Sequence, residues 1–183
     1  FCARYPHVRI RLLNYSAPQA VKALENNIID FAIVSTPVLV HKHMHQEKLV
    51  SYDEILLGGT KYKQFAQQVH YLEDISEMPL IGLCEGSSTH THYSRFFMEH
   101  DLPFEPDMEA AMTDQVLPMI THNLGIGFYP KSLALEAIEK ELVFPIELTE
   151  PLPNRDVVVI TNNHTPINSA ARRFLEFLLE NRK

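Results

Sequence analysis

Residues 5–35 read YPHVRIRLLNYSAPQAVKALENNIIDFAIVS, and this stretch decides the predicted fold. Its apolar residues at positions 8, 10 and 12 alternate as in a strand, whereas those at 21, 24 and 28 recur at helical spacing. A second strand is predicted over 29–35, so the pattern indicates a parallel βαβ unit. Ligands of such sheets bind at the carboxyl ends of the strands, where Ser35 and Thr36 stand.

The same alternation of strand and helix continues along the chain. The first helix is predicted to begin near Ser16, with Pro18 in its first turn and Asn27 in a left-handed conformation at its end. A polar excursion over 36–46 follows the second strand. Further strands are predicted near 52–59, 79–84, 108–111, 125–130, 142–148 and 156–161, and helices or helical turns at 61–69, 73–78, 91–100, 113–121, 131–141 and from 168.

The rhythm breaks near residues 52 and 155, which predicts two α/β lobes joined by crossing strands near 53–59 and 155–161. A cleft between the lobes is then the expected ligand site. Within the helix at 113–121, Thr113 and Asp114 are expected to form the cap, and Pro118 is acceptable only in the first turn.

Composition indicates a soluble globular protein, with 45% hydrophobic and 21% charged residues. No apolar run approaches the roughly 18 residues of a membrane-spanning helix. The net charge is -7 and the basic residues are scattered, which disfavours direct binding of nucleic acid. The two cysteines, Cys2 and Cys84, cannot form a disulfide framework, and this fits a cytoplasmic location.

Three segments together resemble the effector-binding domain of LysR-type transcriptional regulators. They are residues 1–35, GIGFYP at 125–130 and PINSAARRF at 166–174. The resemblance covers essentially the whole chain and implies an α/β fold of the type 2 periplasmic-binding-protein class, with two Rossmann-like subdomains joined by two crossover strands. It assigns 1–54 plus 160–183 to subdomain I and 55–159 to subdomain II. It also places the family's first strand and part of its first helix before Phe1.

The same resemblance implies a ligand-sensing regulatory domain that is not an enzyme. A small effector, anionic or polar, would bind in the cleft between the lobes and control transcription through an N-terminal winged helix-turn-helix that lies outside the 183 residues. Assembly as a homodimer or homotetramer in the cytoplasm is expected. One departure is Asn123, where the family usually has glycine. The alternatives are a periplasmic solute-binding protein of a transporter, which shares the fold, and an enzyme built on the same scaffold.

Eight residues are predicted to contact the ligand. The turn Gly86–Thr89 between a strand and a helix offers hydroxyls and free amides, which bind anions and carboxylates. Each position also has a structural alternative: a helix cap for the hydroxyl residues of the turns, an ordinary strand exit after 34, or a packed core strand at 127–128. The set is Ser35, Thr36, Ser87, Ser88, Thr89, Thr113, Gly127 and Phe128.

Other candidate sites are weaker in this sequence. His41, His43 and His45 alternate and could bind zinc, copper or nickel, yet solvated loop histidines explain them as well. Cys84 reads as a small buried residue, with a reactive thiol as the alternative. No catalytic constellation, resident metal or cofactor is predicted, and the carboxylates of 53–54 are expected to face solvent.

Overall fold

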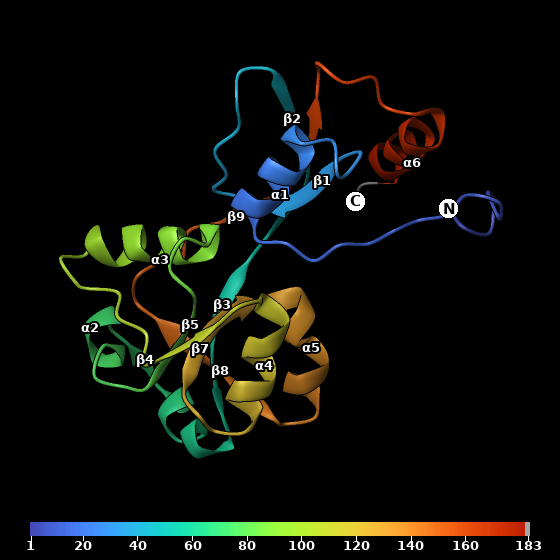
Figure 1. Cartoon of the computed structure of the whole chain (residues 1–183). Helices are drawn as coiled ribbons and strands as arrows, with labels where there is room; N and C mark the ends of the chain where they lie inside the picture. The colour runs from blue at the N-terminus through green and yellow to red at the C-terminus, as the bar shows by residue number, and fades with distance from the viewer. Residues whose placement is uncertain (182–183) are drawn as a thin grey trace. The chain divides into compact units, whose positions relative to one another are not determined.

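Figure 1 shows the protein as a computed structural model, which describes residues 1–181. The chain divides into two compact units. Unit 1 consists of Phe1–Ser51 and the chain from Asp156 onward, and unit 2 is Tyr52–Arg155. From sequence, the boundaries are predicted after residues 54 and 159.

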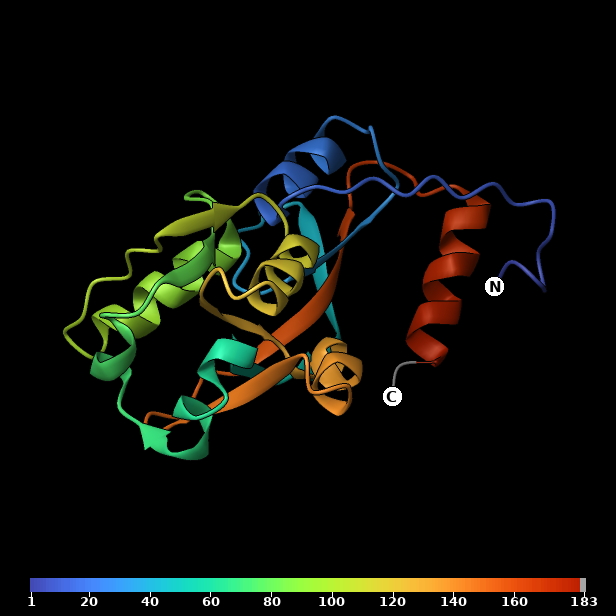
Figure 2. The same cartoon turned by 90° about the horizontal axis from the view of Figure 1, so that it is seen from below.

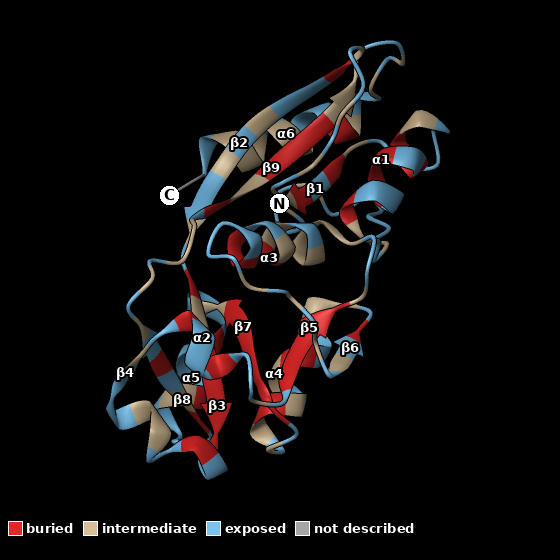
Figure 3. Ribbon diagram, turned by 90° about the vertical axis from the view of Figure 1, so that its left-hand side faces the viewer, coloured by how far each residue is buried: buried red, intermediate tan, exposed pale blue. Residues whose placement is uncertain are grey.

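Unit 2 is built on a mixed six-stranded sheet with the strand order β4-β8-β3-β7-β5-β6. β3 is antiparallel to both of its neighbours, β7 and β8, whereas β5 is parallel to β6 and β7. The central strands β3, β5 and β7 are mostly buried, as Figure 3 shows in red. The bounds are β3 Glu54–Gly59, β4 Val69–His70, β5 Leu80–Leu83, β6 Met108–Ala110, β7 Ile126–Pro130 and β8 Val143–Leu148.

Helices cover both faces of this sheet, because successive strand residues point to opposite sides. Leu56 packs in one cluster with Phe97 of α3, while its neighbour Leu57 packs in another with Ile120 of α4. Figure 1 shows α4 and α5 together on one face of the strands. The helical segments are α2 Leu72–Ile75, α3 Ser88–Met98, α4 Thr113–Thr121, α5 Lys131–Glu139 and the 3-10 turns Thr60–Tyr62 and Phe65–Gln67.

Unit 1 contains a three-stranded sheet with the order β1-β9-β2 and two helices. Leu24 of α1 packs against Val34 of β1 and Ile160 of β9 in one apolar cluster. Phe174 of α6 lies 4.7 Å from Phe1 between ring centroids. The bounds are α1 Ala17–Glu25, β1 Ala32–Ser35, β2 Met44–Tyr52, β9 Arg155–Asn162 and α6 Ser169–Glu180.

The parallel βαβ unit predicted for residues 5–35 is wrong in its first strand and in its pairing, whereas its second strand is confirmed as β1. Residues 5–12 form no strand and are drawn as coil in Figure 2, and β1 runs antiparallel to β9, with Ala32 opposite Ile160. Alternation shows which residues share a face, but a strand also needs a hydrogen-bonded neighbour, and no described strand pairs with 5–12. The helix between them is confirmed: Ser16 is its N-cap and Asn27 has φ 55°.

Three smaller expectations are also corrected. β2 begins at Met44, inside the segment expected to be a polar excursion. The helix expected at 61–69 is two 3-10 turns. In α4, Met112 is the N-cap and Thr113 the first helical residue, so Pro118 lies beyond the first turn. Pro118 is exposed there, which spares its ring a clash with the core, although its missing N–H leaves one carbonyl of the helix without its usual donor.

Asn123 ends α4 in a left-handed conformation, with φ 59°. Its side-chain oxygen accepts a hydrogen bond of 2.8 Å from the backbone N–H of Lys61, which fastens the start of the first 3-10 turn to the end of the helix. Glycine at this position would only permit the left-handed conformation, whereas the asparagine side chain also supplies a hydrogen bond.

We predict that Asn123→Ala lowers the free energy of unfolding by about 2 to 3 kcal/mol, because it loses this acceptor and strains the left-handed backbone. Asn123→Gly should cost only about 1 kcal/mol, since it loses the side-chain hydrogen bonds to Lys61 and Thr60 without straining the backbone. Urea unfolding measures both, with His122→Ala, an exposed neighbour, as control. A glycine variant as stable as the parent would show that the amide contributes nothing.

Candidate functional site

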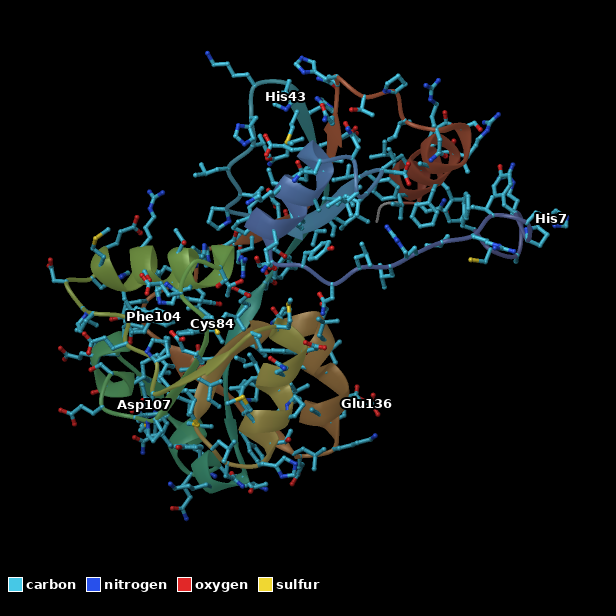
Figure 4. All side chains as sticks on the ribbon, viewed as in Figure 1. His7, His43, Cys84, Phe104, Asp107 and Glu136 are labelled. Carbon is cyan, nitrogen blue, oxygen red and sulfur yellow. The ribbon has the colours of Figure 1, made fainter. Side chains whose placement is uncertain are left out.

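A small hollow opens in unit 2 among β3, β5, β7, α3 and α4. Its volume is about 20 Å³, close to the room that one buried water needs. Figure 4 labels Phe104, one of its lining residues, and Cys84 at the end of β5. The lining residues are Glu54, Ile81, Gly82, Leu83, Thr89, Tyr93, Phe104, Thr113, Val116 and Phe128.

Two parallel strands bring the hydroxyl groups of the hollow together. β5 and β6 pair with Leu83 opposite Ala110, so both strands end at the same edge of the sheet. α3 follows β5 and α4 follows β6, which places Thr89 and Thr113 in the first turns of these two helices. Ser87 caps α3, because its Oγ accepts a hydrogen bond of 3.1 Å from the N–H of His90. Local turn chemistry thus positions the lining hydroxyls.

A buried ion pair contacts one of these hydroxyls, that of Thr89. Arg155 Nη1 lies 3.1 Å from Glu54 Oε1, and each side chain is only 3% exposed. The other carboxylate oxygen of Glu54 accepts a hydrogen bond from the hydroxyl of Tyr93. Arg155 Nη2 donates to Thr89 Oγ1 at 3.1 Å. Burial, reinforced by the charge of Glu54, raises the pKa of Tyr93 well above its usual 10.0, so the phenol stays a donor.

Aromatic side chains form the apolar wall of the hollow. The Tyr93 ring stacks on Phe128 with centroids 4.3 Å apart and planes inclined by 17°. Phe104 lies 5.9 Å from Tyr93 between centroids. The hollow therefore combines a planar apolar surface with hydroxyls and one carboxylate, a mixture typical of small-molecule sites.

The pKa of His92 on α3 is lowered by burial and, after it, by the positive charge of the neighbouring Arg155. This pKa falls from 6.5 to about 4, although a hydrogen bond to the backbone of Pro153 opposes the shift. The Nε2 atom of His92 is buried and has no hydrogen-bond partner among the described residues. At neutral pH the ring is therefore uncharged.

The structure brings three of the eight predicted contacts together, since Thr89, Thr113 and Phe128 all line the hollow. In the same unit, Ser88 opens α3, and Gly127 is packed within β7, where an added Cβ would lie 3.1 Å from the carbonyl oxygen of Ile81. Ser87 caps the helix, as described above. Ligand contact stays a prediction for all of these residues.

The remaining two predicted contacts lie in unit 1. Ser35 ends β1, and Thr36 Oγ1 accepts a hydrogen bond of 3.0 Å from the N–H of Asp156. Thr36 thereby extends the pairing between the ends of β1 and β9. Ligand contact stays a prediction for both residues.

Sequence reasoning missed the ion pair of Glu54 and Arg155. The expectation that Glu54 faces solvent is wrong, although its neighbour Asp53 is exposed. The parity of β3 carried the signal: positions 54 and 56 point to the same face, and Leu56 belongs to the core. An acidic residue on a core face needs a partner, but the sequence does not say which of its cations supplies it.

Three histidines of unit 1 form a stack. The ring of His43 lies 5.7 Å from His41 and 4.7 Å from His164, with nearly parallel planes. Figure 4 labels His43. Stacked rings direct their nitrogens outward at the edges, so these do not converge on one ion. Across residues 1–181, no group of three or more His, Cys, Asp or Glu side chains is placed to hold a metal. Within the same residues, no helix has the length and apolarity to cross a membrane.

A family model described as the LysR substrate binding domain matches residues 1–183. The chain belongs to this family. The type 2 periplasmic-binding-protein-like α/β fold predicted from sequence is thereby confirmed for this LysR substrate-binding domain.

Named relatives of the domain share its fold at low sequence identity. The regulatory domain of Synechocystis PCC6803 CcmR, solved in complex with 2-PG, is 15% identical with a TM-score of 0.86, covering 100% of this chain and 87% of that one. The effector-binding domain of QuiR, solved with shikimate, is 16% identical with a TM-score of 0.78, covering 92% and 78%. The HTH-type transcriptional regulator YofA of Bacillus velezensis is 20% identical, and the match covers 97% of this chain but only 59% of YofA.

We predict that Arg155→Met lowers the free energy of unfolding by about 3 to 5 kcal/mol, because it leaves the Glu54 carboxylate buried without its counter-charge. Adding Glu54→Gln to that variant should recover most of the loss, since no buried charge remains. Urea unfolding of the two variants measures the difference. Equal stability of the single and double variants would refute the coupling.

The lowered pKa of His92 makes stability depend on pH in one direction. The unfolded chain takes up a proton on this ring near pH 6.5, whereas the folded domain does so only near 4. Stability from His92 is thus complete above pH 6.5 and is lost as the pH falls towards 4.

We expect His92→Gln to reduce the loss of stability between about pH 7 and pH 5, measured by urea unfolding at both values. The exposed His122→Gln serves as control and should leave the loss unchanged. Identical pH profiles for the parent and His92→Gln would contradict the shift.

Proposed function

We propose that this LysR substrate-binding domain binds a small-molecule effector at the hollow of unit 2 and so regulates transcription as part of a longer protein. The observation that carries the proposal is the meeting of two hydroxyls, the carboxylate of a buried ion pair and an aromatic wall in one hollow. The chain spans about 59% of the length of YofA, which supports a larger regulator. The ligands solved with CcmR and QuiR support a small polar effector.

Each lining group has a distinct task in the proposal. Thr89 and Thr113 donate hydrogen bonds to the polar head of the effector, and the rings of Phe104 and Phe128 cover its apolar part. Because the hollow has room for about one small group, the rest of the effector lies outside it. The other predicted contacts of unit 2, on α3 and β7, are proposed to line that remainder, and Ser35 and Thr36 of unit 1 are proposed as further ligand contacts.

Effector binding can regulate the protein because binding and conformational change are thermodynamically coupled. A ligand shifts a conformational equilibrium only by the difference between its affinities for the two states. We propose that effector binding favours one state of an oligomer, a homodimer or homotetramer, whose DNA contacts are made by a winged helix-turn-helix outside residues 1–183. The proposed location is the cytoplasm. The proposed role is sensing, without turnover of the effector.

We predict that Thr113→Val weakens effector binding by about 5-fold to 30-fold, because it removes one hydrogen-bond donor and keeps the shape of the side chain. A thermal-shift screen against carboxylates, sugar acids, amino acids and inorganic anions identifies the ligand, since binding to the folded state raises its stability. Calorimetry then compares the parent with Thr113→Val. Thr149→Val, a substitution at an exposed threonine elsewhere in unit 2, is the matched control and should bind normally.

Two results would contradict the proposed function. One is a ligand whose affinity is the same in the parent and in Thr113→Val, which would place binding elsewhere. The other is chemical conversion of the bound ligand, followed by chromatography of the incubated sample, which would indicate an enzyme. Loss of a transcriptional response in Thr113→Val, with the response kept in Thr149→Val, would support the regulator.

A further inference from the structure

The charge around the hollow of unit 2 limits which ligands it can accept. Among its lining residues, all within the described chain, Glu54 is the one carboxylate, and none is a lysine or arginine. The nearby cation is Arg155, which donates a hydrogen bond to Thr89 and forms an ion pair with Glu54 at 3.1 Å. A negative ligand group therefore enters a hollow whose own charged group is negative and whose nearest described cation is already paired.

The directions of the hydrogen bonds further limit the chemical groups that the hollow can bind. Thr89 Oγ1 accepts a hydrogen bond from Arg155 Nη2, which leaves its own hydroxyl hydrogen to donate. The Tyr93 hydroxyl donates to Glu54 and does not compete for the ligand. The ligand group that meets Thr89 is thus an acceptor, and it lies beside the stacked rings of Tyr93 and Phe128.

From these contacts we propose that the hollow selects ligand groups with at most one negative charge, such as the carboxylate of an aromatic or other planar acid, and that Glu54 excludes doubly charged phosphate and phosphonate groups. The inference rests on the proposed function and names its ligand class. Excess negative charge in a buried site costs free energy unless a cation compensates it. In this hollow the nearby cation, Arg155, already compensates the charge of Glu54.

Two probes of the same shape test the charge rule directly. Benzenesulfonate carries one negative charge, whereas phenylphosphonate carries two at about pH 8, above the second pKa of a phosphate-type group. Calorimetry on the parent protein should show at least about tenfold tighter binding of benzenesulfonate. At about pH 5.5, where phenylphosphonate holds its second proton, this preference should shrink.

Glu54→Gln should abolish the preference of the parent for benzenesulfonate. The substitution leaves Arg155 without its carboxylate, so phenylphosphonate should bind at least about tenfold more tightly than to the parent at about pH 8. The double variant Glu54→Gln/Arg155→Met removes both charges and should lose this gain. Glu147→Gln, at an exposed position of unit 2, is the matched control and should behave as the parent. Circular dichroism checks that each variant is folded, and the pH comparison on the parent tests the rule without any variant.

The outcomes separate this inference from the proposed function. If the parent binds phenylphosphonate as well as benzenesulfonate at about pH 8, and Thr113→Val weakens both, the hollow is the effector site but the charge rule is overturned. If neither probe responds to Thr113→Val, the hollow is not the binding site and both proposals fall. Preference for the singly charged probe, abolished by Glu54→Gln and kept in Glu147→Gln, supports the rule.

Discussion

The buried contact between Glu54 and Arg155 is the interaction on which the rest of unit 2 depends. The two residues are 101 positions apart, and their side chains are almost fully withdrawn from water. Removing charges from water is costly, and only close mutual pairing with added hydrogen bonds offsets that cost. Tyr93 and Thr89 supply those bonds from one face of α3, so the ion pair, the helix and the floor of the hollow hold one another in place.

The scaffold explains why polar chemistry gathers at this point. Parallel pairing of β5 with β6 aligns two strand ends, and each strand feeds a helix whose first turn carries a threonine. Antiparallel pairing of β3 with β7 then sets Leu56 opposite Phe128, two positions along β3 from Glu54. An apolar cluster that includes Leu56 and Phe128 lies on this face, and the charges of the ion pair are isolated from solvent.

Local signals in the sequence predicted most elements of unit 2 correctly. The buried run that became β5 is an example, and in unit 1 so is the capped start of α6 at Asn168, because caps and short-range periodicity depend on near neighbours. Pairing partners were not predictable in the same way: residues 5–12 have a strand pattern but no strand to pair with. Thr89, Thr113 and Phe128 were found from turn chemistry and family resemblance. The Glu54 and Arg155 pair was not, since no local rule joins residues so distant in sequence.

The division of the chain has a consequence for the order of folding. Unit 2 is one continuous segment, whereas the sheet of unit 1 needs β9, which is synthesised only after the whole of unit 2. During synthesis, β1 emerges early and has no described partner until β9 follows. Unit 2 can complete its core first, because domains fold as units while the chain is made. The sheet of unit 1 therefore forms last, and β1 and β2 must avoid aggregation until β9 has been synthesised.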